Sequence, residues 1–178
     1  MSERAHFVLL AQYNEWMNAK VYAAAAALPS NAWLADRGAF FGSVAGTLNH
    51  IVAGDTIWMR RFATHPTRFA ALEPVLAWPA PAALDTRYSD DLPTLHARRR
   101  QLDAIILQWV TALAEADLEQ VIDYTNMKGV ASRKRFGTLL LHFFNHQTHH
   151  RGQASVLLSQ AGGDVGVTDL LALIPNLD

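Results

Sequence analysis

The chain has 178 residues, of which 51% are hydrophobic, and its 15 lysines and arginines against 16 aspartates and glutamates give a formal net charge of -1. This length suits a single globular domain over residues 1–178, and the balanced charge lacks the basic field that nucleic acids and anionic membranes select. The chain has no cysteine, which excludes disulfides, thiolate metal ligands and a cysteine nucleophile.

The start of the chain, MSERAHFVLL, lacks the basic segment, apolar stretch and cleavage site of a secretory leader. The longest wholly apolar run, VYAAAAAL, is far shorter than the ~20 residues that a helix needs to span a bilayer. We therefore expect a cytoplasmic protein that has neither a membrane nor a nucleic acid as its partner.

Two amphipathic helices are predicted in the first third of the chain. Residues 2–28 carry apolar side chains at helical spacing and end at LPSN, and residues 43–62 repeat the pattern after Ser43, which suits an N-cap. Residues 63–89 are expected to form a long crossover loop on the surface, because their prolines are too many for a helix interior. These prolines are Pro66, Pro74, Pro79 and Pro81.

The second half of the chain predicts further helices. Residues 89–116 open with aspartates and a proline, as a third helix would, and their arginines at 98–100 are expected on its solvated face. Residues 121–136 alternate apolar and polar side chains around NMKG, which favours a short hairpin. A fourth helix over residues 137–163 and a short C-terminal helix over residues 167–174 follow. The expected fold class is all-α: a four-helix bundle with a long crossover loop between helices 2 and 3 and a short hairpin before helix 4.

Histidines are concentrated in residues 142–153, which read HFFNHQTHHRGQ and hold four of the eight in the chain. On a helix that advances ~100° per residue, all four lie on one stripe. His146 and His150 face the apolar side, whereas His142 and His149 lie toward its edge. Buried imidazoles need polar partners, and a divalent metal that binds both unprotonated nitrogens is an effective one.

A third ligand must come from another helix, and His50 is the best of the remaining histidines. It lies inside the second predicted helix, on the face of Thr47, Ile51 and Trp58, and Gly54 leaves room beside it. Taken alone, a histidine such as His50 is more often a hydrogen-bonded core residue, and a pair of histidines at i, i+4 arises by chance about as often as by function. The combination of the three is stronger than its parts.

Three further side chains are candidates for support of the ligands. For His142 and His149 the simpler interpretation is an edge histidine bonded to backbone or water, and orientation of a ligating imidazole is the alternative. Asp55 is either a solvated acid or an acid that orients an imidazole across the bundle. The sequence does not identify a catalytic side chain.

The histidines lie in stretches that resemble a known family. TLNHIVAGDTIW at residues 47–58 and HFFNHQTHHRGQ at 142–153 are similar to the DinB (damage-inducible, YfiT-like) family of metal-dependent bundle proteins, and AQYNEWMNAKVYAAAAALP fits its first helix. The resemblance covers nearly the whole chain and implies a four-helix bundle, a homodimer and one divalent metal ion. Matched residue by residue, the implied metal ligands are His50, His146 and His150, the trio that the helical wheel selects.

Three neutral histidine ligands leave a coordination position for water or substrate, as in catalytic metal sites. The first hypothesis is therefore a metal-dependent enzyme in which Zn, Ni, Co, Mn or Fe lowers the pKa of a bound water or thiol. The resemblance implies a transferase or isomerase that uses a low-molecular-weight thiol with a small-molecule substrate, and a hydrolase is the close alternative. The second hypothesis is a non-catalytic binding or stress-response protein, a dimer that the metal stabilises.

Two other enzyme classes lack their signatures. A carboxylate-bridged di-iron bundle needs two Glu-x-x-His motifs, and the spacing from Glu3 to His6 is the only one in the chain. A serine hydrolase of the G-x-S-x-G type is also unsupported, because no such turn occurs.

Overall fold

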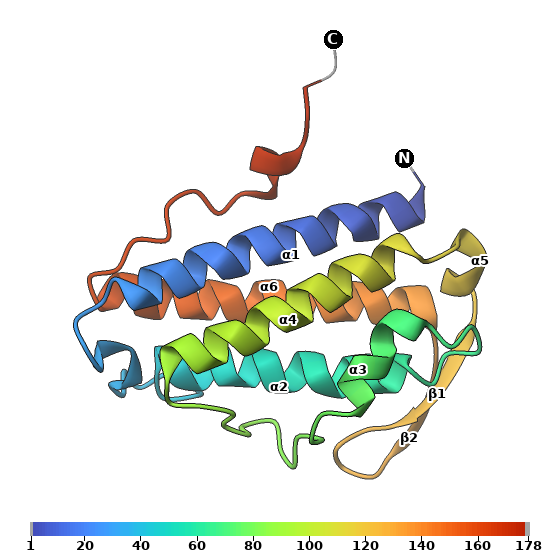
Figure 1. Ribbon diagram of the computed structural model, residues 1–178, viewed down its shortest axis with the longest axis horizontal. Coiled ribbons are helices and arrows are strands. Elements are labelled where there is room, and N and C mark those ends of the chain that lie inside the picture. Colours follow the sequence, from blue (N-terminus) through green and yellow to red (C-terminus); the bar gives the residue numbers. More distant parts are fainter. Residues whose placement is uncertain (1, 177–178) are drawn as a thin grey trace.

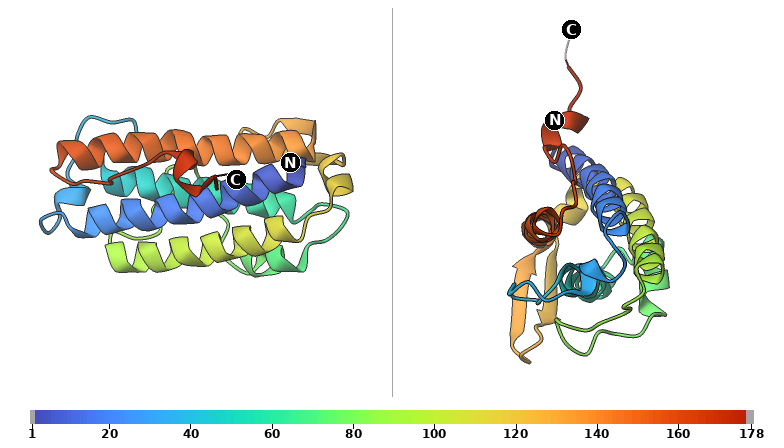
Figure 2. Two further views of the ribbon diagram at one scale, coloured as in Figure 1. Left: turned by 90° about the horizontal axis from the view of Figure 1, so that it is seen from above. Right: turned by 90° about the vertical axis from the view of Figure 1, so that its left-hand side faces the viewer.

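The computed structural model describes residues 2–176 and is mostly helical, with one small two-stranded sheet. Four long helices lie side by side (Figures 1 and 2). They are α1 (Glu3–Ala26), α2 (Val44–Phe62), α4 (Leu92–Thr111) and α6 (Phe136–Gln160). In Figure 1, α2 and α6 run in opposite directions, and they contact each other along their length. Among residues 2–176, none of the helices combines the length and apolar character that crossing a bilayer requires.

Two side chains that the sequence predicts at the starts of helices cap those helices in the structure. Ser43 caps α2, because its hydroxyl accepts a hydrogen bond from the backbone N–H of Gly46 at 3.0 Å. Asp91 caps α4 in the same way through the N–H of Thr94 at 2.9 Å. These contacts satisfy N–H groups that the first turn of a helix cannot pair internally.

Short elements connect the long helices. They are the 3₁₀ turns η1 (Ala32–Leu34), η2 (Ala70–Leu72) and η3 (Leu170–Leu173), the short helices α3 (Glu73–Leu76) and α5 (Glu115–Leu118), and strands β1 (Val121–Thr125) and β2 (Ala131–Arg135). The antiparallel strands pair Val121 with Arg135 and Thr125 with Ala131, and Gly129 turns the chain with a φ of 78°. The predicted hairpin is thus confirmed.

Two predictions about connections need correction. Residues 63–89 are not a plain loop, because η2 and α3 fold within them and the buried side chains of Leu72 and Val75 attach them to the core. Pro74 is tolerated there because it lies in the first turn of α3, where its missing N–H costs nothing. The predicted C-terminal helix is only the 3₁₀ turn η3, and Pro175, two residues after its end, disfavours a helical conformation for Ile174.

The arginines at 98–100 were expected on a solvated face, and for Arg99 that prediction is wrong. The Arg99 side chain is 1% exposed and forms ion pairs with Asp55 of α2 and, at 3.0 Å, with Asp103 of α4. Arg100 is exposed and Arg98 is half-buried. A buried guanidinium is tolerated only with charged partners, and here two carboxylates supply them.

This ion pair belongs to a polar network between the helices. Asp103 also accepts hydrogen bonds from the amides of Asn14 and Asn18 on α1, at 2.9 and 2.8 Å. Gln147 of α6 donates to Asp55 at 2.8 Å. The network therefore links all four long helices by charged and amide groups in the interior, where a polar group left without a partner would be costly.

Candidate metal centre

Three histidines predicted from the sequence come together between α2 and α6. His50 projects from α2, and His146 and His150 project from successive turns of α6. Each ring offers a nitrogen within 4.8 Å of the nitrogens offered by the others. The ring centroids are 4.3 Å apart for His50 and His150, 4.4 Å for His146 and His150, and 5.1 Å for His50 and His146.

Hydrogen bonds fix which nitrogens of two of these rings are free to bind a metal. Nδ1 of His50 lies 2.7 Å from the carbonyl oxygen of Leu84, and Nδ1 of His150 lies 2.7 Å from Oε1 of Gln153. Since both oxygens can only accept, each Nδ1 carries the proton and donates it. Each Nε2 therefore presents a lone pair, which is the state in which histidine binds a metal.

The two free nitrogens face each other. Nε2 of His50 and Nε2 of His150 are 3.1 Å apart. Two lone pairs at this separation repel unless a proton or a cation lies between them. A divalent cation with histidine ligands at about 2.0–2.1 Å would satisfy both nitrogens, so the donor set fits a metal such as Zn²⁺.

Burial keeps the candidate ligands neutral. His50 is 3% exposed, and His146 and His150 are half-buried. Burial, helped by the neighbouring imidazoles, lowers the pKa of His146 to about 3. Burial also lowers the pKa of His150 to about 4, against the opposing effect of its hydrogen bond with Gln153, and it lowers the pKa of His50. All three rings are thus deprotonated at neutral pH, as metal binding requires.

A glycine provides the space for the third ring. A Cβ placed on Gly54 would lie 2.8 Å from Cε1 of His146, closer than side chains pack. The sequence predicted that Gly54 leaves room beside His50, and in the structure the ring occupying that room is His146. The small residue on α2 therefore permits the close approach of an imidazole from α6.

Asp55 lies on another side of α2 from the histidines. It is fully buried, so it is not a solvated acid, and its hydrogen bonds go to Gln147 and Arg99 rather than to an imidazole. Five residues along a helix correspond to a rotation of ~140° from His50, which points this side chain away from the three rings.

The two edge histidines lie where the helical wheel places them, both exposed. The ring of His142 packs against Trp58 at 5.0 Å and is 6.0 Å from His146. Nε2 of His149 lies 3.3 Å from Nε2 of Gln153, whose Oε1 bonds to His150. His149 therefore contacts the Gln153 amide, which orients the candidate ligand His150.

Three groups at the site were not predicted. The Leu84 carbonyl comes from the segment between α2 and α4, and a backbone oxygen has no sequence signal. Phe41 stacks on His50 with ring centroids 3.9 Å apart and covers one of its faces. Gln153 lies three residues after His150, a spacing that places it on the same helix face and could have identified it.

The fold and the site define a helical protein that brings three histidines from two antiparallel helices to one point. A family model described as the DinB family matches residues 1–175, and the chain therefore belongs to the DinB family. Protein DinB of Bacillus subtilis (strain 168) is 25% identical over 160 residues, which cover 90% of this chain and 88% of that protein. No solved structure matches the chain.

Proposed function

We propose that the protein binds one divalent metal ion through His50, His146 and His150 and is a metal-dependent enzyme. The observation that carries the proposal is the 3.1 Å separation of the two Nε2 atoms of His50 and His150, each of which presents a lone pair. Membership of the DinB family supports it, because the trio matches the ligands that the family resemblance implies.

The surrounding side chains have defined tasks in this proposal. The Leu84 carbonyl and the Gln153 amide hold the tautomer and orientation of two ligands, and Phe41 covers a face of His50 against water. Gly54 leaves the space in which His146 approaches the other two rings. A divalent metal held by these three histidines would supply Lewis acidity, which lowers the pKa of a water or thiol.

The proposed reaction class is thiol-dependent group transfer or isomerisation of a small molecule. The chain has no cysteine, so a thiol nucleophile arrives as a cosubstrate of low molecular weight. Hydrolysis with water as the nucleophile uses the same ligands and is the alternative. Zn, Ni, Mn and Fe all suit a donor set of imidazoles, and metal analysis decides among them.

The remaining proposals concern the whole molecule. We propose that the four long helices form the four-helix bundle of the family as a single domain over residues 1–178, in a cytoplasmic homodimer. Leu141 and Val156 support a dimer through helix faces, because both lie on the outer side of α6 and are 59% and 58% exposed.

The test starts with protein expressed without a histidine tag and analysed for metal by mass spectrometry. We expect about one metal ion per chain, lost in the His146→Ala variant and retained in His142→Ala, an exposed neighbour on the same helix. A protein without metal, or a His146→Ala variant that keeps it, contradicts the proposed site.

The enzymatic part needs a second measurement. The loaded protein and the folded His146→Ala variant are assayed against a panel of electrophiles with low-molecular-weight thiols, and against esters and amides without them. Turnover by the metal-loaded protein and not by the His146→Ala variant supports the proposal that the protein is a metal-dependent enzyme. A metal that raises the melting temperature, with no turnover in either panel, favours the non-catalytic alternative.

A further inference from the structure

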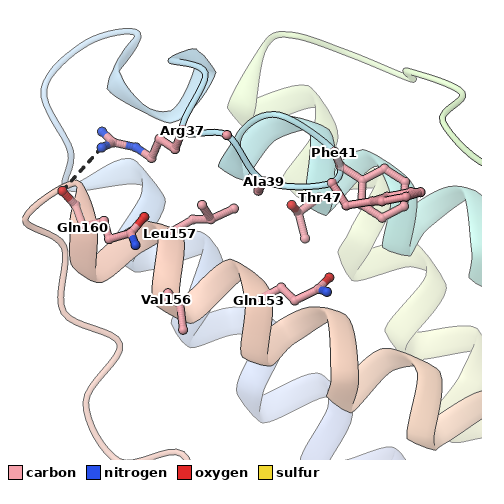
Figure 3. A pocket seen from close by; sticks show the side chains of 10 residues that line it. Arg37, Ala39, Phe41, Thr47, Gln153, Val156, Leu157 and Gln160 are labelled. Atoms are coloured by element: carbon pink, nitrogen blue, oxygen red, sulfur yellow. Dashed lines mark hydrogen bonds between the residues drawn. The ribbon is translucent and has the colours of Figure 1, made fainter.

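A hollow of about 370 Å³ lies beside the candidate metal centre, between α6 and the segment that precedes α2 (Figure 3). Its size is at the lower end of the range for small-molecule sites. The side chains that the argument uses are Arg37, Ala39, Phe41, Gln153, Leu157 and Gln160.

Two walls of this hollow also contact the candidate ligands. The ring of Phe41 lines it and stacks on His50, and the amide of Gln153 lines it and bonds to Nδ1 of His150. A molecule in the hollow therefore touches the two side chains that cover or orient ligands, so its near end lies next to the metal centre.

The hollow carries a positive charge and no negative one. Arg37 is the charged residue among those that line it, and α6, which forms its floor, has no aspartate or glutamate from Phe136 to Gln160. Within residues 2–176 the Arg37 guanidinium forms no salt bridge, and its hydrogen bond goes to the carbonyl of Gln160 at 3.3 Å. The neighbouring Asp36 accepts a hydrogen bond from the N–H of Gly38 instead.

The polar groups lie at opposite ends of an apolar middle. In Figure 3, Arg37 and Gln160 lie at one end and Gln153 at the other, with Leu157 between them. Ala39 lines the opposite wall. This order of groups is complementary to a molecule with an anionic end and a short apolar body.

We propose that this hollow binds the substrate of the enzyme as a small organic acid, with its carboxylate on Arg37 and its apolar body along Leu157. The body then extends toward Gln153 and the metal centre. A carboxylate fits better than a phosphate, because one planar guanidinium matches two carboxylate oxygens, whereas a dianion needs more donors than the hollow presents. This assignment of a substrate class rests on the proposed function.

The test uses hexanoate and its neutral isostere hexanamide as probes, with binding measured by calorimetry. The proteins are the wild type, Arg37→Gln, and Arg133→Gln as a matched control, since Arg133 is exposed on β2 and does not line the hollow. Each is measured as purified and after removal of metal, because a carboxylate can also bind a metal directly.

We expect the wild type to bind hexanoate about tenfold more tightly than hexanamide, the difference that one charge-assisted contact supplies. Arg37→Gln should lose this preference with unchanged binding of hexanamide and of Zn²⁺, and Arg133→Gln should keep it. Three results would overturn the proposal. The wild type binds the two probes equally, or it shows no measurable binding of hexanoate, or both variants lose the preference for hexanoate to the same extent.

The same titrations separate this proposal from the proposed function. Zn²⁺ binding without any Arg37-dependent binding of hexanoate overturns the assignment of the hollow and leaves the metal centre intact. Arg37-dependent binding of hexanoate by a protein that takes up no metal supports the hollow as an acid-binding site and contradicts the metal enzyme.

Discussion

Nε2 of His50 and Nε2 of His150 face each other at 3.1 Å, while the Nδ1 atom of each ring donates to an oxygen. The two outer hydrogen bonds determine which nitrogens point inward. Because the inner pair has no proton of its own, a cation between the rings removes the repulsion of the lone pairs. Metal binding should therefore depend on the distance between α2 and α6 as much as on the ligands themselves.

The Gly54→Ala variant tests this dependence on spacing. The added methyl group would lie 2.8 Å from Cε1 of His146, so the ring or the helix must shift. We expect metal affinity to fall by about tenfold or more, since loss of an oriented ligand costs at least ~1.4 kcal/mol. A metal titration of the folded variant measures it.

Gly152→Ala is the matched control. A Cβ at this position of α6 meets nothing within 4 Å, so we expect unchanged metal binding and a stability gain of about 0.5–1 kcal/mol from the better helix former. Equal metal affinity in Gly54→Ala and Gly152→Ala would show that the spacing at His146 does not matter.

The second prediction concerns the pH at which metal is released. The folded pKa values of His146 and His150, about 3 and about 4, lie below the usual 6.5 of histidine. Protons therefore compete with the metal only as the pH falls toward these values, and half-release should come below about pH 5 rather than near 6.5. Metal content after dialysis at a series of pH values gives the midpoint.

The same lowered pKa values affect the metal-free protein. Between pH 6.5 and about 4 the unfolded chain binds more protons at His146 and His150 than the folded chain does. The contribution of the neutral rings to stability is therefore complete above pH 6.5 and declines as the pH falls.

One outcome would contradict the prediction about metal release. Metal release centred at pH 6.5, in protein that circular dichroism shows to be folded, would contradict the burial of the rings.

The third prediction concerns the buried ion pairs. Replacing Arg99 by alanine leaves the carboxylates of Asp55 and Asp103 buried without their cation. We expect a loss of about 3–5 kcal/mol in the free energy of unfolding, as for other broken buried pairs. Arg100→Ala removes the exposed neighbour on the same helix and should change stability by less than about 0.5 kcal/mol. Urea denaturation compares the two, and similar losses would refute the role of the network.

The fourth prediction is the homodimer. The chain has a mass of 19.7 kDa, and light scattering at micromolar concentration should give about twice that value. Val156→Glu places a charge on the exposed apolar face of α6 and should shift the mass toward the monomer. A wild-type protein that scatters as a monomer at every concentration tested would contradict the prediction.

Local patterns determine much of the fold and of the site. The period of apolar residues predicts the long helices, Ser43 and the aspartates before α4 mark their starts, and the alternation around NMKG predicts the hairpin. The spacing of His146 and His150 places both on one face of α6, because four residues make about one turn. These features follow from the sequence because each depends on the geometry of a single element.

Only the tertiary structure decides which groups from other elements meet these faces. Arg99 occurs in a run of arginines typical of a solvated face, yet it is buried because Asp55 on another helix and Asp103 supply its charged partners. Asp55 turns toward this network and away from the histidines. The Leu84 carbonyl reaches His50 from a segment 34 residues further along the chain. A helical wheel gives the direction of a side chain but not the neighbour it meets, because that neighbour is set by how the helices pack.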